Sequence, residues 1–255
     1  MSEATPEQVT SNAPLEAVSP TEPPKVPPRK VTLYLVRHGQ TQYNIEHRLP
    51  GQLAGVSLTD EGRKQAQQLG ESLTDMPLTT IVTSPLERAL QTAEYVRGSR
   101  DIPLREEPRL MDTNVGRWAG QVISDLDKNE PEWLSFRRRP THPPPGIEGF
   151  YEVLQRIIAV SEEVRHDESL GDAIMLVAHA DVVKLLIAHY MRLPIEGVPW
   201  LHIANASVTT LTFMGDHGPT MEALNWTPSP AWLRPPLPKE ESPQSATDVA
   251  PVSNP

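Results

Sequence analysis

The chain has 255 residues, 28 prolines and no cysteine, and its formal net charge at pH 7 is −10. The lack of cysteine excludes disulfides, thiolate metal sites and cysteine nucleophiles. The acidic balance argues against non-specific nucleic-acid binding, which needs a basic surface. The N-terminus has no signal-peptide pattern, and the most apolar stretch, 173–191, is interrupted by histidine, aspartate and lysine. We therefore predict a cytoplasmic protein that neither spans nor binds a membrane.

Proline divides the chain into three parts. Residues 1–29 hold seven prolines and residues 228–255 hold eight, among many Ser, Thr, Glu and Ala residues. Such segments bury too little apolar surface to offset the entropy lost on ordering. We predict two disordered Pro-rich tails, 1–29 and 228–255, on either side of one folded domain at 30–227.

Strand patterns alternate with helix patterns along this domain. In chain order the predicted elements are a strand at 31–36, a helix from Thr59–Asp60, a strand at 80–83, a helix from Ser84–Pro85 to about Val96, a strand at 102–105, short helices at 123–126 and 132–138, a long helix at 150–164, a strand at 172–177, a helix at 181–191, and strands at 207–213 and 220–224. The alternation predicts an α/β fold, a three-layer α/β/α sandwich with a mainly parallel sheet. The last two strands are predicted to form a hairpin.

Three local signals define turns and helix starts. Thr59 is predicted to cap a helix whose first turn is acidic. Ser84 is predicted as a cap with Pro85 at the first helical position. Gly39 allows a sharp turn after the first strand.

Basic and imidazole side chains follow three of the predicted strands. Arg37 and His38 follow the first strand, Arg88 lies one turn beyond the second, and His179 follows the strand at 172–177. Ligands of open α/β sheets bind beyond the carboxyl ends of strands. Arginine holds two phosphoryl oxygens at once, and neutral imidazole is a nucleophile for phosphorus. With a carboxylic acid to protonate the leaving alcohol, these residue types predict phosphate-ester cleavage.

The same residues lie in a series of ordered motifs. These are Arg37-His38-Gly39-Gln40-Thr41 with Asn44, Leu58-Thr59 with Gly62 and Ala66, Ser84-Pro85-Leu86-Glu87-Arg88-Ala89-Leu90-Gln91-Thr92-Ala93, Gly116-Arg117-Trp118-Ala119-Gly120, a weaker set of Gly146, Glu148 and Arg156, and Val177-Ala178-His179. In this order they resemble the landmarks of the histidine phosphatase superfamily, which includes the cofactor-dependent phosphoglycerate mutases. The full series is far more specific than a lone Arg-His-Gly.

The resemblance implies a histidine phosphatase (phosphoglycerate mutase-like) fold, with 30–227 as the catalytic domain. It implies hydrolysis of a small phosphomonoester, a sugar phosphate or similar metabolite, through a phosphohistidine on His38. The implied site residues are catalytic His38, Asp112 and His179, and phosphate-binding Arg37, Asn44 and Arg88. No cofactor and no metal ion are implied, and the chain has neither cysteine nor an HExxH motif.

Two positions depart from the family pattern. Asp112 lies where the family usually has a glutamate proton donor, and its side chain is one methylene shorter. Glu106 and Glu107 are nearby substitutes for this role. Ala180 stands where glycine often follows the second histidine. The first departure makes the approach of the loop that carries the acid critical, since a misplacement of about 1 Å lowers a rate roughly 10²-fold.

Two other functions are compatible with these motifs. A mutase would return the phosphoryl group to the substrate, but only 66 residues separate Asp112 from His179, which is short for the long insertion of the mutases. A weakly active phospho-ligand-binding or scaffold protein would use its Pro-rich tail for docking. We favour the phosphatase, with a small phosphorylated metabolite as its ligand and no nucleic-acid or membrane partner. The sequence leaves a homodimer open.

Overall fold

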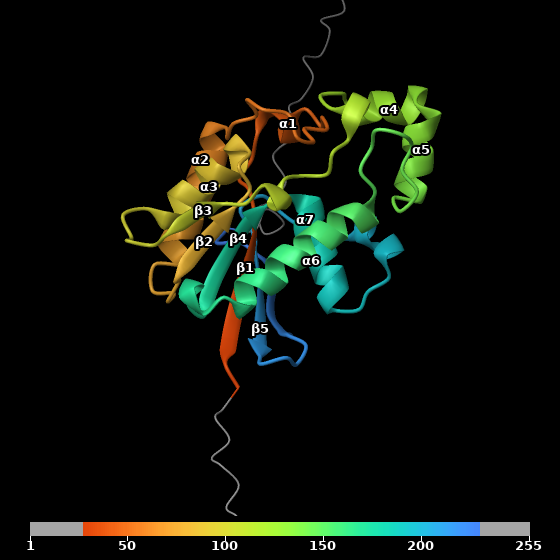
Figure 1. The fold of residues 1–255 in the computed structure, drawn as a ribbon. Coiled ribbons are helices and arrows are strands. Elements are labelled where there is room, and N and C mark those ends of the chain that lie inside the picture. The colour runs from red at the N-terminus through yellow and green to blue at the C-terminus, as the bar shows by residue number, and fades with distance from the viewer. Residues whose placement is uncertain (1–27, 230–255) are drawn as a thin grey trace, which may run out of the picture.

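The structure is a computed structural model that describes residues 28–229 (Figure 1). The two predicted disordered tails lie outside the described residues, except for residues 28, 29, 228 and 229. Within the described part, no helix has both the length and the apolar character needed to cross a membrane.

A six-stranded sheet forms the centre of the molecule, in the order β3-β2-β4-β1-β5-β6. Its strands are β1 (Lys30–Arg37), β2 (Thr80–Thr83), β3 (Leu104–Glu106), β4 (Ala173–Ala178), β5 (Val208–Met214) and β6 (Thr220–Trp226). The β3-β2-β4-β1 pairings are parallel, whereas β5 runs antiparallel to both β1 and β6. The mainly parallel sheet and the terminal hairpin are therefore confirmed.

Helices cover both faces of the sheet, which confirms the three-layer architecture (Figure 1). Leu33 and Leu35 of β1 pack in one apolar cluster with α6 (Phe150–His166) and α7 (Ala180–Tyr190). Tyr34 and Val36 pack in a second cluster with α2 (Asp60–Ser72) and α3 (Glu87–Arg97). Successive side chains of a strand point to opposite faces, so an almost continuously apolar strand such as β1 has to be covered on both.

Shorter elements connect the strands and helices of these layers. They are α1 (Gln42–Ile45), α4 (Ile123–Asn129) and α5 (Pro131–Arg138), with 3₁₀ turns at η1 (Pro108–Leu110), η2 (Gly116–Trp118), η3 (Glu168–Leu170) and η4 (Ile195–Trp200). Figure 1 shows α4 and α5 to one side of the sheet, beyond the end of α6. Buried Trp118 and Trp133 meet edge to face at 5.3 Å between ring centroids, which ties this region to the main core.

All predicted strands and helices are present, with ends that differ by up to three residues from the prediction. Thr59 caps α2 as predicted, because its Oγ1 accepts a hydrogen bond from the Gly62 amide at 3.0 Å. The prediction for Ser84 is wrong: α3 begins at Glu87, with Leu86 at the N-cap position. The Ser84 hydroxyl accepts the Leu86 amide ahead of the helix and also contacts His179.

Gly39 has a different role from the predicted sharp turn. Its backbone φ is not in the left-handed region. A Cβ at this position would lie 2.5 Å from the carbonyl oxygen of Gly62, at the start of α2. The glycine is therefore required by close approach between the loop after β1 and the first turn of α2.

Candidate active site

The parallel strands β1, β2 and β4 end at the same edge of the sheet and bring two histidines together. His38 follows β1, and its backbone amide donates to the Ala178 carbonyl of β4 at 3.0 Å. His179 follows β4 and occupies the N-cap position of α7. The ring centroids are 5.3 Å apart, and both side chains are buried. Two histidines about 140 positions apart in the sequence thus lie together, as expected from their places after parallel strands.

The hydrogen bond of His38 defines its tautomer. Its Nδ1 lies 2.7 Å from the Gly39 carbonyl oxygen. A carbonyl only accepts, so Nδ1 carries the proton and Nε2 keeps a free lone pair. Burial, followed by the positive charges of Arg88 and Arg37, lowers the pKa of His38 well below 6.5. The ring is therefore neutral near pH 7 and has an unprotonated nitrogen for attack.

His179 is held by the serine that follows β2. Its Nε2 lies 2.8 Å from Oγ of Ser84, which also accepts the Leu86 amide at 3.3 Å. Burial and then the charge of Arg88 lower the pKa of His179 well below 6.5. Its Nδ1 is buried without a hydrogen-bond partner among residues 28–229. That nitrogen is available to a ligand.

Two arginines place further unpaired nitrogens at this edge. Arg88 is fully buried and donates from Nη2 to the Gly51 carbonyl at 2.7 Å, while its Nε and Nη1 have no partner in the described chain. Arg37 donates from Nη1 to the Ile203 carbonyl at 2.5 Å, and its Nε has no partner within residues 28–229. A buried, unsatisfied polar group costs about 1–3 kcal/mol, and more when it is charged. With Nδ1 of His179, these nitrogens form a cluster suited to a bound anion.

Asp112 brings a carboxyl group to the same cluster. Its Oδ2 accepts from Arg88 Nη2 at 3.1 Å and lies 3.8 Å from His179 Nδ1, and its Oδ1 accepts the Thr113 amide at 3.0 Å. Burial raises its pKa to about 6, against the opposing charge of Arg88, and Asp181 raises it further. A carboxyl group that exchanges its proton near neutral pH is suited to acid–base work.

The two substitute glutamates do not join this cluster. The carboxylate of Glu107 is paired with Arg109 at 2.8 Å, and Glu106 is exposed on β3. Ala180 is accommodated without strain, because it begins α7 and its φ is not positive. Within residues 28–229, no three His, Asp or Glu side chains are grouped as metal ligands.

Asn44 is close to His38, but its carbonyl oxygen is already engaged. Oδ1 accepts from the Thr41 amide at 3.0 Å and from Asn205 Nδ2 at 3.1 Å. Only the Asn44 NH₂ group has no partner in the described chain, so only this end is open to a ligand. Asn205 also donates to the His38 carbonyl at 3.1 Å. Sequence reasoning missed Asn205, since a lone asparagine before a strand carries no local signal.

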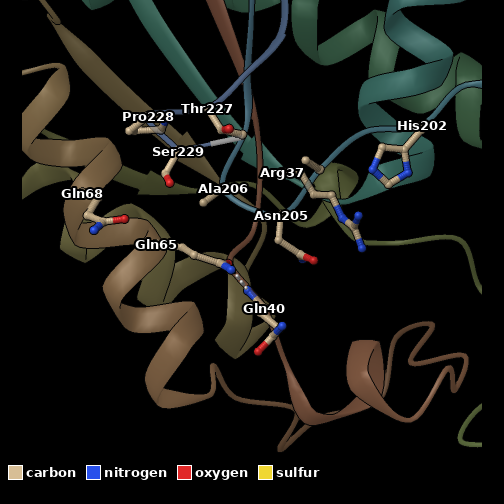
Figure 2. Close-up of a pocket in the computed structure, with 11 residues that line it drawn as sticks. Arg37, Gln40, Gln65, Gln68, His202, Asn205, Ala206, Thr227, Pro228 and Ser229 are labelled. Carbon is tan, nitrogen blue, oxygen red and sulfur yellow. Dashed lines mark hydrogen bonds between the residues drawn. The ribbon is translucent and has the colours of Figure 1, made fainter. Parts of the chain in front are cut away.

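A cavity of about 230 Å³ has Arg37 in its wall. Figure 2 shows Arg37 and Asn205 beside each other on its wall, with Gln65 and Gln68 of α2 opposite. His38, His179, Arg88 and Asp112 do not line this cavity. Arg37 is common to the cavity and to the anion cluster, and Asn205 of the cavity wall contacts His38 and Asn44.

Known proteins resemble this chain in sequence and in fold. Residues 33–227 match the sequence profile of the histidine phosphatase superfamily (branch 1). The glucosyl-3-phosphoglycerate phosphatase of Mycobacterium tuberculosis is 33% identical over 203 residues, which cover 76% of this chain and 91% of that protein. A probable phosphoglycerate mutase of Shigella boydii is 30% identical over 186 residues, 71% of this chain and 84% of that protein.

A solved structure of the mycobacterial glucosyl-3-phosphoglycerate phosphatase, in complex with VO3, matches with a TM-score of 0.64 and 33% identity. The match covers 71% of this chain and 92% of that one. Sequence and fold agree over most of the described residues, and the chain belongs to the histidine phosphatase superfamily.

Proposed function

We propose that this chain hydrolyses a small phosphomonoester, a sugar phosphate or similar metabolite, through a phosphohistidine on Nε2 of His38. The observation that carries the proposal is a set of buried nitrogens, from Arg37, Arg88 and His179, that lie near the neutral His38 ring and have no partner in the part of the chain that the structure describes. Such a site fits a tetrahedral anion. The relative named glucosyl-3-phosphoglycerate phosphatase, which forms a complex with VO3, supports phosphate removal from a sugar-containing substrate.

In the first half-reaction the phosphoryl oxygens bind Arg37, Arg88 and His179, and the Asn44 amide adds one hydrogen bond. The lone pair of His38 Nε2 attacks phosphorus, and the bond from phosphorus to the ester oxygen breaks. Protonated Asp112 gives its proton to the departing alcohol. Because burial keeps the pKa of Asp112 at about 6, a useful fraction of the group is protonated near neutral pH.

In the second half-reaction, ionised Asp112 takes a proton from a water molecule while the water oxygen bonds to phosphorus. The bond to His38 Nε2 breaks and inorganic phosphate leaves. Nε2 regains its lone pair, and the carboxyl group regains its proton, so the site returns to its starting state.

Turnover of p-nitrophenyl phosphate tests the proposal, with wild-type protein compared with His38→Ala. We expect turnover by the wild type only, at least about 10⁴-fold faster than the variant, because removal of a covalent nucleophile is among the largest catalytic losses. An acid-labile, alkali-stable phosphoryl label should appear on the wild type and be absent from the variant. Equal rates in the two proteins would leave only the weakly active, ligand-binding role.

The mutase remains a second candidate, because one relative is named a probable phosphoglycerate mutase. The test is to add phosphoglycerate and to measure free phosphate against the isomeric phosphoglycerate. We expect phosphate release, and isomer formed without phosphate would favour the mutase. The cytoplasmic location and the lack of nucleic-acid partners stay predictions from the sequence.

A further inference from the structure

Arg156 of α6 donates to three main-chain carbonyls of the segment that carries Asp112. Its Nη1 donates to Arg109 at 2.5 Å and to Met111 at 2.7 Å, and its Nη2 donates to the Asp112 carbonyl at 3.0 Å. The remaining two N–H groups go to Glu148, from Nε at 2.7 Å and from Nη2 at 3.0 Å. All five donors of the guanidinium are thus used, and three of them hold the backbone around the proposed acid.

Glu148 extends this hold past Asp112. Its Oε2 accepts the Asn114 amide at 2.9 Å, and its own amide donates to the Asn114 carbonyl at 2.8 Å. The pair is largely shielded, with 18% of the Arg156 side chain and 17% of the Glu148 side chain exposed. The segment is therefore fixed before and after Asp112 by one ion pair. We call Arg156 and Glu148 the clamp.

A third contact holds the segment from the other side of the site. Gln52 donates from Nε2 to the Asp112 carbonyl at 2.8 Å. The neighbouring Gly51 carbonyl accepts from Arg88, which also binds the Asp112 carboxylate. The main chain of Asp112 is thus held directly by both Arg156 and Gln52, while its side chain is held by the arginine of the anion cluster.

We propose that Arg156, oriented by Glu148, is a positioning residue that places the short carboxyl side chain of Asp112 for proton transfer. This inference rests on the proposed function. Aspartate reaches one methylene less far than glutamate, so the backbone has to be drawn toward the site and kept there. Proton transfer requires hydrogen-bond distance to the leaving oxygen, and an error of about 1 Å lowers the rate roughly 10²-fold. Arg156 acts through Asp112, because all five of its N–H groups are taken by protein oxygen atoms.

The leaving group separates positioning from general structural support. Phenol has a pKa close to that of a tyrosine side chain, about 10, and leaves slowly without a proton, whereas p-nitrophenol needs little protonation. We expect Arg156→Lys, which keeps the charge but loses the planar fork, to lower kcat/KM for phenyl phosphate about 30-fold or more. For p-nitrophenyl phosphate we expect a loss of less than about 3-fold.

A double-mutant cycle with Asp112→Asn gives the decisive readout. If Arg156 acts only through the acid, Arg156→Lys has no further effect on phenyl phosphate turnover once the acid is absent. Glu148→Gln keeps the shape of the second clamp residue, and we expect a smaller loss in the same direction. Arg165→Lys is the matched control, since Arg165 is also ion-paired on α6 but contacts Glu162, and it should leave both rates unchanged.

Three results would overturn the inference. The first is an equal loss of kcat/KM for both substrates in Arg156→Lys. The second is a double variant in which the losses of kcat/KM from Arg156→Lys and Asp112→Asn multiply. The third applies if Arg156→Lys does not fold: folded Glu148→Gln then shows the wild-type ratio of kcat/KM for the two substrates. Failure of the wild type to hydrolyse either substrate would instead refute the proposed function, and Asp112→Asn without leaving-group dependence would refute the role of the acid.

Discussion

Two regions of the site are held in place by different means: the strand-end cluster, which consists of Arg37, His38, Arg88 and His179, and the segment that carries Asp112. Arg37 pairs with Ala178 in the β1–β4 register, and the His38 amide continues this backbone ladder. Asp112 lies between two 3₁₀ turns, where the side chains of Arg156 and Gln52 hold its carbonyl. The sheet therefore fixes Arg37, His38 and His179, and α3 supplies Arg88, whereas side-chain contacts fix the main chain of the acid. Substitutions in the first region should lower kcat/KM for every substrate. Substitutions in the second should lower kcat/KM most for substrates whose leaving group needs a proton.

Among the substitutions that compare the two regions, removal of Arg88 should lower kcat/KM the most. We expect Arg88→Ala to lower kcat/KM about 10³-fold for p-nitrophenyl phosphate and at least as much for phenyl phosphate, because a buried charge that balances the phosphoryl oxygens is removed and the Asp112 carboxylate also loses this partner. Steady-state kinetics check this, with Arg97→Ala on the same helix as the control. A loss of less than about 10-fold would place Arg88 outside the phosphoryl site.

Asp112→Asn should separate the two substrates. We expect a loss of about 10² for phenyl phosphate and of less than about 10-fold for p-nitrophenyl phosphate, since the amide keeps the size of the carboxyl group but has no proton to donate. The ratio of the two kcat/KM values is the measurement. A uniform slowdown would remove Asp112 from the role of acid.

The pH dependence should report on the same group. The general acid acts when protonated, so kcat/KM for phenyl phosphate should fall tenfold per pH unit above the Asp112 pKa of about 6. The pKa of His38 lies well below 6.5, so its protonation should cause no loss between pH 6 and pH 7. Dividing the wild-type profile by that of Asp112→Asn cancels the titration of the substrate phosphate. A flat quotient between pH 5 and pH 8 would contradict the assignment.

Ser84→Ala should have the smallest effect. It removes the hydroxyl that binds His179 Nε2, and loss of such an orienting contact lowers activity by about 10-fold. Because His179 belongs to the strand-end cluster, both substrates should be affected equally. Ser72→Ala, on the surface of α2, is the control. An effect confined to phenyl phosphate would instead tie Ser84 to the acid.

Local patterns predicted the elements well because most of the core is built from uninterrupted apolar runs. β1 and β4 are apolar on both faces, and α6 and α7 carry clear apolar repeats. Ser84 misled the prediction, since Ser-Pro is a strong helix start by itself, yet a buried histidine 95 residues away competes for the hydroxyl. The hydroxyl accepts the Leu86 amide in a local turn, and α3 begins only at Glu87.

The sequence by itself determined the order of strands and helices, because this follows from the hydrophobic period. It also selected His38, Arg88 and His179 as candidate site residues, from their positions after strands and from the motifs that resemble the family. Only the tertiary structure decided which partners those groups have. The tautomer of His38, the raised pKa of Asp112 and the hold of Arg156 on a segment 45 residues earlier arise from burial and from hydrogen bonds across the fold. Short-range pattern contains no information on such distant contacts, and they set the chemistry of the site.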